Sequence, residues 1–249
     1  LGTCSGSDYG LVTDTLTVAA GGHHVLDLVV TGGAAPPRPF TIRTHGSGDL
    51  TPLSNWNMSD DQVTHEILPA LYAPLAALDD QGEWFSDLLV QVPTVSNGGA
   101  TVVSDQLVVT YQLEPGLLWS DGTPLTSSDV RFTWELMTQP DPHVNSYRVQ
   151  VNPVWQIERV DTPDAQTAVV TYERGVIPPG YLDAIPYLMP EHVLGGEHRI
   201  DVRWGSAYAH HPVGNGSYVV TEHVPGSHLD LRANLISDAL VAGCRAAGH

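Results

Sequence analysis

The chain has 249 residues, of which 42% are hydrophobic and 15% charged, and its formal net charge is −18. Its ten basic residues are all Arg and are scattered singly, whereas a nucleic-acid binder needs a basic stripe that displaces counterions. Nucleic acid is therefore not an expected partner. The lack of Lys excludes a phosphate-binding loop and Schiff-base catalysis. No apolar run reaches the roughly 18 to 20 residues of a membrane helix, so no membrane span is expected.

Residues 1–38 are predicted to form a leader that closes with the linker-like "TGGAAPPRP". Its opening, "LGTC", resembles a bacterial lipobox, which makes Cys4 a candidate for lipidation and gives a protein that is anchored to a membrane without spanning it. Thr3 matches the lipobox poorly and the basic and apolar regions of a signal peptide are missing, so a free thiol is the alternative. No required disulfide with Cys244 is expected, because both cysteines lie in small-residue terminal segments.

The next elements follow from periodicity. Alternation over residues 40–45 predicts a strand, and "GSGDLTPLSN" after it predicts a loop. A helix is predicted from Ser59, with apolar residues at four-residue spacing and a kink or break at Pro69 and Pro74. Residues 90–95 and 106–113 are predicted to be antiparallel strands, and residues 167–173 a further strand. Residues 216–233 are predicted to form a hairpin that turns at Pro225-Gly226.

The stretch "LLWSDGTPLTSSDVRF" (117–132) contains an Asp, a Ser and a Trp that could belong to an active site. Each polar residue has a backbone role instead. Asp121 and Gly122 suit a tight turn, and Thr126 with Asp129 forms a capping box for a helix that ends before Pro140. Asp121 is therefore predicted to be structural. Core positions are predicted for three tryptophans, Trp84, Trp119 and Trp134.

The motifs of common enzymes are missing. "HEILP" (65–69) begins like the zinc-protease helix, but Pro69 stands where the second His must be, and no G-x-S-x-G sequence occurs. The adjacent histidine pairs point to opposite faces of a strand, so neither is a natural chelate. His223 and His228 flank the predicted hairpin turn and could approach each other. The sequence predicts no enzyme, no cofactor and no metal site.

Four blocks, taken in order, resemble family 5 extracytoplasmic solute-binding proteins, the oligopeptide, dipeptide and nickel group of ABC importers. They are "LYAPLAALDDQGEWFSDLL", "LVVTYQLEPGLLWSDGTPLTSSDVRFTWELM", "YLMPEH" and "HPVGNGSYVVTEHVPGSHLDL". The chain departs from the family at Glu114, where a basic residue is usual, and at Asn215 and Ser217 in the glycine motif. Thr51 also stands where the family more often has Asp.

The resemblance implies an α/β fold: the mixed-sheet lobe of a type II periplasmic-binding-protein-like structure, with the second lobe missing. It assigns residues 39–232 to a partial first lobe and residues 233–249 to a tail outside the family pattern. It further implies an extracytoplasmic substrate-binding component for peptides or similar solutes, which delivers them to a cognate permease. A truncated N-terminal part is expected to bind weakly or not at all alone, because one lobe offers half the contact surface. It is also expected to self-associate, because it exposes apolar area that the missing segments would cover.

Residual ligand contacts are predicted in the loop after the first strand, where glycines let backbone groups approach a ligand closely. These residues are Gly46, Ser47 and Gly48, with Trp56 and Tyr72 as apolar walls, for which plain core packing is the alternative. The competing function is a secreted metal-binding domain or hydrolase that uses His and carboxylates. The sequence does not identify the solute.

Overall fold

The computed structural model describes residues 15–19, 22–23, 45–46, 62–140, 153–198, 201–202, 207–224 and 228–234. The chain divides into two compact units. Unit 1 comprises residues 1–72, 120–122 and 203–249, and unit 2 comprises residues 73–119 and 123–202.

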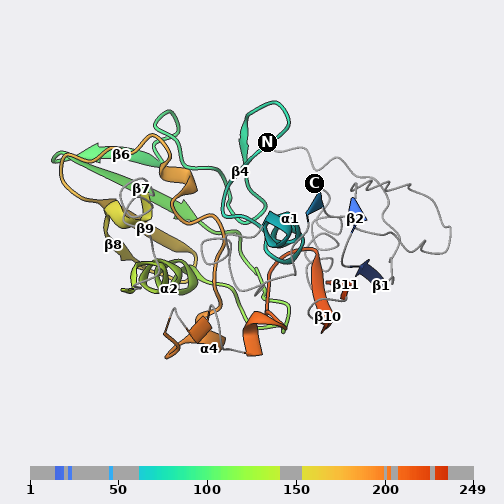
Figure 1. The fold of residues 1–249 in the computed structure, drawn as a ribbon. Coiled ribbons are helices and arrows are strands. Elements are labelled where there is room, and N and C mark those ends of the chain that lie inside the picture. The colour runs from blue at the N-terminus through green and yellow to red at the C-terminus, as the bar shows by residue number, and fades with distance from the viewer. Residues whose placement is uncertain are drawn as a thin grey trace. The chain divides into compact units, whose positions relative to one another are not determined.

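Unit 2 is built on a four-stranded antiparallel sheet (Figure 1). Its strands, in spatial order, are β6 (Ala100–Val103), β7 (Gln106–Gln112), β9 (Thr167–Tyr172) and β8 (Ile157–Asp161). Alternate residues of β7 are buried, because successive side chains of a strand point to opposite faces. The predicted strand at 167–173 is confirmed as β9.

Helix α2 (Ser127–Thr138) packs against β8 and β9 in unit 2 (Figure 1). The predicted capping box forms at its start, and the chain leaves the helix at Gln139, before Pro140, as the sequence predicts. Val130, Leu136 and Met137 are buried in the core of the unit. The described part of the unit also contains shorter elements: β4 (Ala77–Leu78), β5 (Trp84–Phe85), η1 (Pro153–Gln156), η2 (Tyr181–Asp183) and α4 (Glu191–Leu194).

One predicted strand is wrong. Residues 90–95 form no strand, and the partner of β7 is β6, from Ala100↔Val109 to Val103↔Gln106. Pro93 has no N–H to donate to a ladder, and the following residues close a turn in which Thr94 N donates to Asn97 Oδ1 at 2.9 Å. The hairpin turns at Ser104-Asp105, both with positive φ, 51° and 66°. That conformation usually belongs to Asn-Gly or Asp-Gly, so no turn signal is visible in the sequence at this point.

Unit 1 contains α1 (Gln62–Leu71) and a three-stranded antiparallel sheet, with β11 (His228–Ala233) between β1 (Thr15–Ala19) and β10 (Tyr218–Val224). The predicted hairpin of residues 216–233 is confirmed, although its turn lies outside the described residues. Strand β1 comes from the predicted leader and pairs with β11 from Thr15↔Arg232 to Ala19↔His228. The boundary at residue 38 remains a prediction.

Two short strands, β2 (Gly22–His23) and β3 (His45–Gly46), pair with each other, and η3 (Ala207–Ala209) precedes the β10–β11 hairpin. Residues 40–44 of the strand predicted at 40–45 lie outside the described residues. The predicted helix from Ser59 is described from Gln62, and it contains Pro69 and ends at Leu71, before Pro74.

The three tryptophans predicted in the core differ in burial. Trp119 is fully buried, whereas Trp84 and Trp134 are half-buried. Trp84 lies on the two-stranded β4–β5 ribbon, which has too few strands to cover it. Among the residues that the structure describes, no helix is both long and apolar enough to cross a membrane.

Candidate functional site

The residues predicted to contact a ligand are only partly described. Gly46 lies in β3, where its backbone is opposite Gly22. Ser47, Gly48, Trp56 and the candidate lipidation residue Cys4 lie outside the described residues, as does Cys244. Tyr72 directly follows α1 and is 1% exposed, which is the core packing that the sequence left as the alternative.

The glycine segment Gly214–Gly216 packs directly on the end of α1 within unit 1. Gly216 N donates a hydrogen bond to Leu71 O at 2.9 Å. A Cβ atom at Gly214 would lie 2.0 Å from that same carbonyl oxygen, and one at Gly216 would lie 2.6 Å from Ala70 O. Both distances are far below van der Waals contact, so only glycine allows this approach. The glycine motif therefore anchors the β10–β11 hairpin to α1.

The turn that contains Ser120 also contacts the glycine segment. Ser120 N donates to Gly214 O at 2.8 Å, and Gly214 N donates to Ser120 Oγ at 3.2 Å. The Asp121-Gly122 turn that the sequence predicts is confirmed, with Gly122 at φ 88°. Two segments 94 positions apart in the sequence are thus joined by a reciprocal pair of hydrogen bonds.

Two buried tyrosines complete this junction. The hydroxyls of Tyr72 and Tyr208 lie 3.0 Å apart, and Tyr208 also donates to Val213 O at 3.0 Å. Burial raises the pKa of both phenols. Both therefore stay protonated near neutral pH, which suits positioning of the 207–213 segment and not acid–base chemistry.

In unit 2, the side chain of Asp129 joins separate segments by hydrogen bonds. Its carboxylate accepts hydrogen bonds from Thr126 N at 2.8 Å and Glu191 N at 3.0 Å, and Trp119 Nε1 lies 3.4 Å from Oδ2. Burial raises the pKa of Asp129, and these hydrogen bonds counteract the rise. The side chain thus joins the starts of α2 and α4, which the capping-box pattern predicted only for α2.

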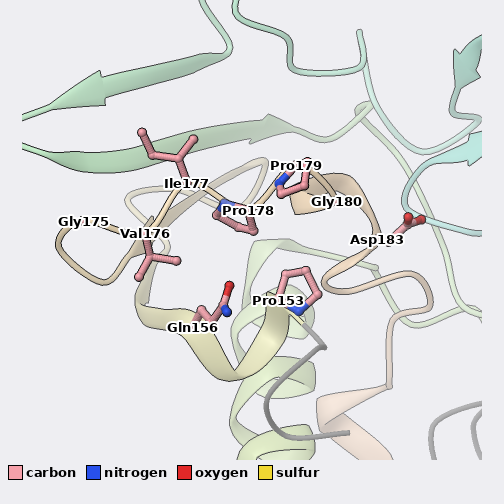
Figure 2. A pocket seen from close by; sticks show the side chains of 9 residues that line it. All are labelled: Pro153, Gln156, Gly175, Val176, Ile177, Pro178, Pro179, Gly180 and Asp183. Atoms are coloured by element: carbon pink, nitrogen blue, oxygen red, sulfur yellow. The ribbon is translucent and has the colours of Figure 1, made fainter. Parts of the chain in front are cut away.

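A pocket of about 530 Å³ lies in unit 2, between η1 and the segment from Gly175 to Gly180 (Figure 2). Figure 2 shows Pro153, Pro178 and Pro179 gathered in its lining, with Gln156 and Asp183 as its polar side chains. Burial raises the pKa of the Asp183 carboxyl. The lining could accept a small apolar group with a polar end. The Pro178-Pro179 pair is the sequence signal that could have drawn attention to it.

Two histidines of unit 1 lie in close contact. Nδ1 of His210 lies 3.2 Å from Nδ1 of His223, and the ring centroids are 5.1 Å apart. The sequence left open an approach of His223 to His228. Strand pairing places His223 opposite Leu229, and the side chain of His228 is not described. In the described part of the chain, no three His, Cys, Asp or Glu residues are grouped around a common metal position.

Solved structures with this fold come from solute-binding proteins. An oligopeptide-binding protein of Thermus thermophilus, solved with a pentapeptide, superposes with a TM-score of 0.60 at 22% sequence identity. The ABC transporter substrate-binding protein CtaP of Listeria monocytogenes gives a TM-score of 0.59 at 26% identity. Each match covers 76% of this chain and 36% of the other. The predicted fold class, a partial lobe of the peptide-binding group, is confirmed.

Residues 83–235 match the model of the bacterial extracellular solute-binding proteins, family 5. The chain belongs to this family, as the four blocks predicted. A Brucella ovis protein, provisionally named as an ABC transporter peptide-binding protein, is 27% identical over 169 residues. That alignment covers 67% of this chain but 29% of the Brucella protein, so the chain spans less than a third of this relative's length.

Proposed function

We propose that the protein is the extracytoplasmic substrate-binding component of an ABC importer and that its substrates are peptides or peptide-like solutes. The single observation that carries the proposal is the family match over residues 83–235, which includes the α2 block, the α4 block and the glycine segment. The similarity to the Brucella protein supports peptides as the solute class. In this role the protein binds and releases its solute unchanged and is not an enzyme.

The partner that this function requires is a cognate permease in the membrane. A lipid on Cys4 would hold the protein beside that permease, because an acyl chain anchors a protein without a spanning helix. Permease and lipid anchor both follow from the proposed role, and each can be tested separately from solute binding.

The ligand contacts that we propose are Gly46, at the end of β3, and the residues Ser47 and Gly48 that follow it in the sequence, with Trp56 as an apolar wall. The reason is chemical, since a glycine-rich backbone exposes amide groups that can bond a peptide main chain. Tyr72 contributes differently. Because it is buried and bonded to Tyr208, it supports the binding region from within.

The test is isothermal titration of the protein, expressed from its complete gene, with a pool of short peptides. A matched pool, hydrolysed to free amino acids, is the control. The proposal predicts saturable heat with the peptides and none with the hydrolysate. Equal responses to the two pools, or none to either by a folded monomer seen in light scattering, would refute a peptide-binding role.

A further inference from the structure

The His210–His223 contact in unit 1 brings together two segments that share no strand ladder. His210 follows η3 and is exposed, whereas His223 lies on β10 and is 9% exposed. Both rings present Nδ1, and not Nε2, to each other at 3.2 Å, with ring planes 40° apart. The contact is therefore specific to one nitrogen of each imidazole.

That nitrogen separation matches the bite of a tetrahedral metal ion. Zn²⁺ binds imidazole nitrogen at about 2.0–2.1 Å, and tetrahedral angles then place two such nitrogens about 3.3 Å apart. A square-planar ion of similar bond length would need about 2.9 Å. The observed 3.2 Å lies closer to the tetrahedral value. The negative net charge of the chain, −18, also favours accumulation of cations at its surface.

We propose that His210 and His223 form a two-histidine site for a divalent transition-metal ion of Zn²⁺ type. The ion takes the Nδ1 lone pairs of both neutral imidazoles. No third His, Cys, Asp or Glu among the described residues is grouped with the pair. Glu222 and Asp230 are paired across β10 and β11, and Glu222, as the strand neighbour of His223, points to the opposite face. The pair includes none of the residues proposed to contact the solute.

A bound ion would clamp the segment ahead of Gly214 to β10. The 207–213 segment is otherwise held by Tyr208, whose hydroxyl bonds Tyr72 and Val213. Because the ion binds only the folded protein, the free energy of unfolding increases with the metal concentration.

The test measures Zn²⁺ binding and Zn²⁺-dependent melting on the tag-free protein, with Mg²⁺ as the control ion. His210→Gln removes one ligand at an exposed position and is expected to leave the fold intact. His211→Gln, also exposed and adjacent, is the matched control. The chain has twelve histidines, so weaker background binding of Zn²⁺ is expected in every variant. The decisive quantity is therefore the number of Zn²⁺ sites lost in His210→Gln compared with His211→Gln.

We expect His210→Gln to weaken this site by at least about tenfold, because loss of even an outer-shell partner of a metal ligand typically lowers affinity about 10–100-fold. The variant should also abolish the site's contribution to the Zn²⁺-induced rise in melting temperature. His223→Gln should do the same, and His211→Gln should resemble the parent protein. If all three variants bind Zn²⁺ with the parent's stoichiometry and affinity, the pair is a hydrogen-bonded contact only and the proposal is wrong.

Discussion

Positions 214 and 216 require glycine because a Cβ atom there would clash with the backbone at the end of α1, and not because of a turn conformation. Both residues lie against carbonyl groups at the end of α1, where no side-chain atom fits. The sequence showed the glycine motif but not its partner, because Leu71 and Gly214 lie far apart along the chain and no local pattern links them. This contact is the clearest case of a residue whose role only the fold reveals.

Gly214→Ala should therefore be strongly destabilising. Overpacking a close contact typically costs about 1–3 kcal/mol, and here the backbone of α1 must move because the clash is with Leu71 O. Chemical denaturation measures the loss. Gly180→Ala is the control, since its Cβ would meet only ordinary contacts at 3.9 Å. Equal stabilities for the two variants would show that the glycine junction does not support the fold.

Asp129→Asn should also lower the free energy of unfolding. A carboxylate accepts hydrogen bonds at both oxygens, whereas an amide offers one acceptor and turns N–H donors toward either Thr126 N or Glu191 N. Leaving such a buried donor unsatisfied costs about 1–3 kcal/mol. Asp80→Asn makes the same charge change at an exposed position and serves as the control. Identical unfolding midpoints for both variants would contradict the anchoring role of Asp129.

At the scale of elements, sequence reasoning succeeded where a pattern and its boundary signals agreed. The α2 capping box, strand β9 and the β10–β11 hairpin were each predictable in this way. The prediction is wrong at β6, because the strand expected at residues 90–95 contains Pro93 and the hairpin turns at Ser104-Asp105. Strand β8 was not predicted at all, because "IERVD" buries only Ile157 and Val160 and lacks regular alternation.

The β6–β7 turn gives an element-scale prediction. Ser104 and Asp105 both adopt the left-handed region, which costs a non-glycine residue about 1 kcal/mol and is relieved by Asn-Gly. The double substitution Ser104→Asn with Asp105→Gly should raise stability by about 0.5–1 kcal/mol, the usual gain when a residue suits its backbone conformation better. Thermal unfolding measures the gain as a higher melting temperature. A destabilised double variant would mean that the Ser104 and Asp105 side chains matter more than their backbone conformation.

At the scale of the whole molecule, the sequence predicted the family and the class of fold, because several motifs recur in a fixed order. It could not place the candidate site in the same way. Of the predicted ligand loop the structure describes only Gly46, and Tyr72 is buried. The His210–His223 contact is not visible in the sequence, because only the fold brings the two residues together. The local pattern pointed instead to His223 and His228, which flank the hairpin turn.

The central claim is that this protein supplies peptides to an importer, and uptake by living cells tests it most directly. The measurement is accumulation of a labelled peptide pool in the source strain, in a strain that lacks the gene, and in the deletion strain with the gene restored. We predict that deletion lowers peptide uptake while uptake of a labelled free amino acid is unchanged, and that restoration recovers it. Undiminished uptake of every peptide in the deletion strain would contradict the proposed function.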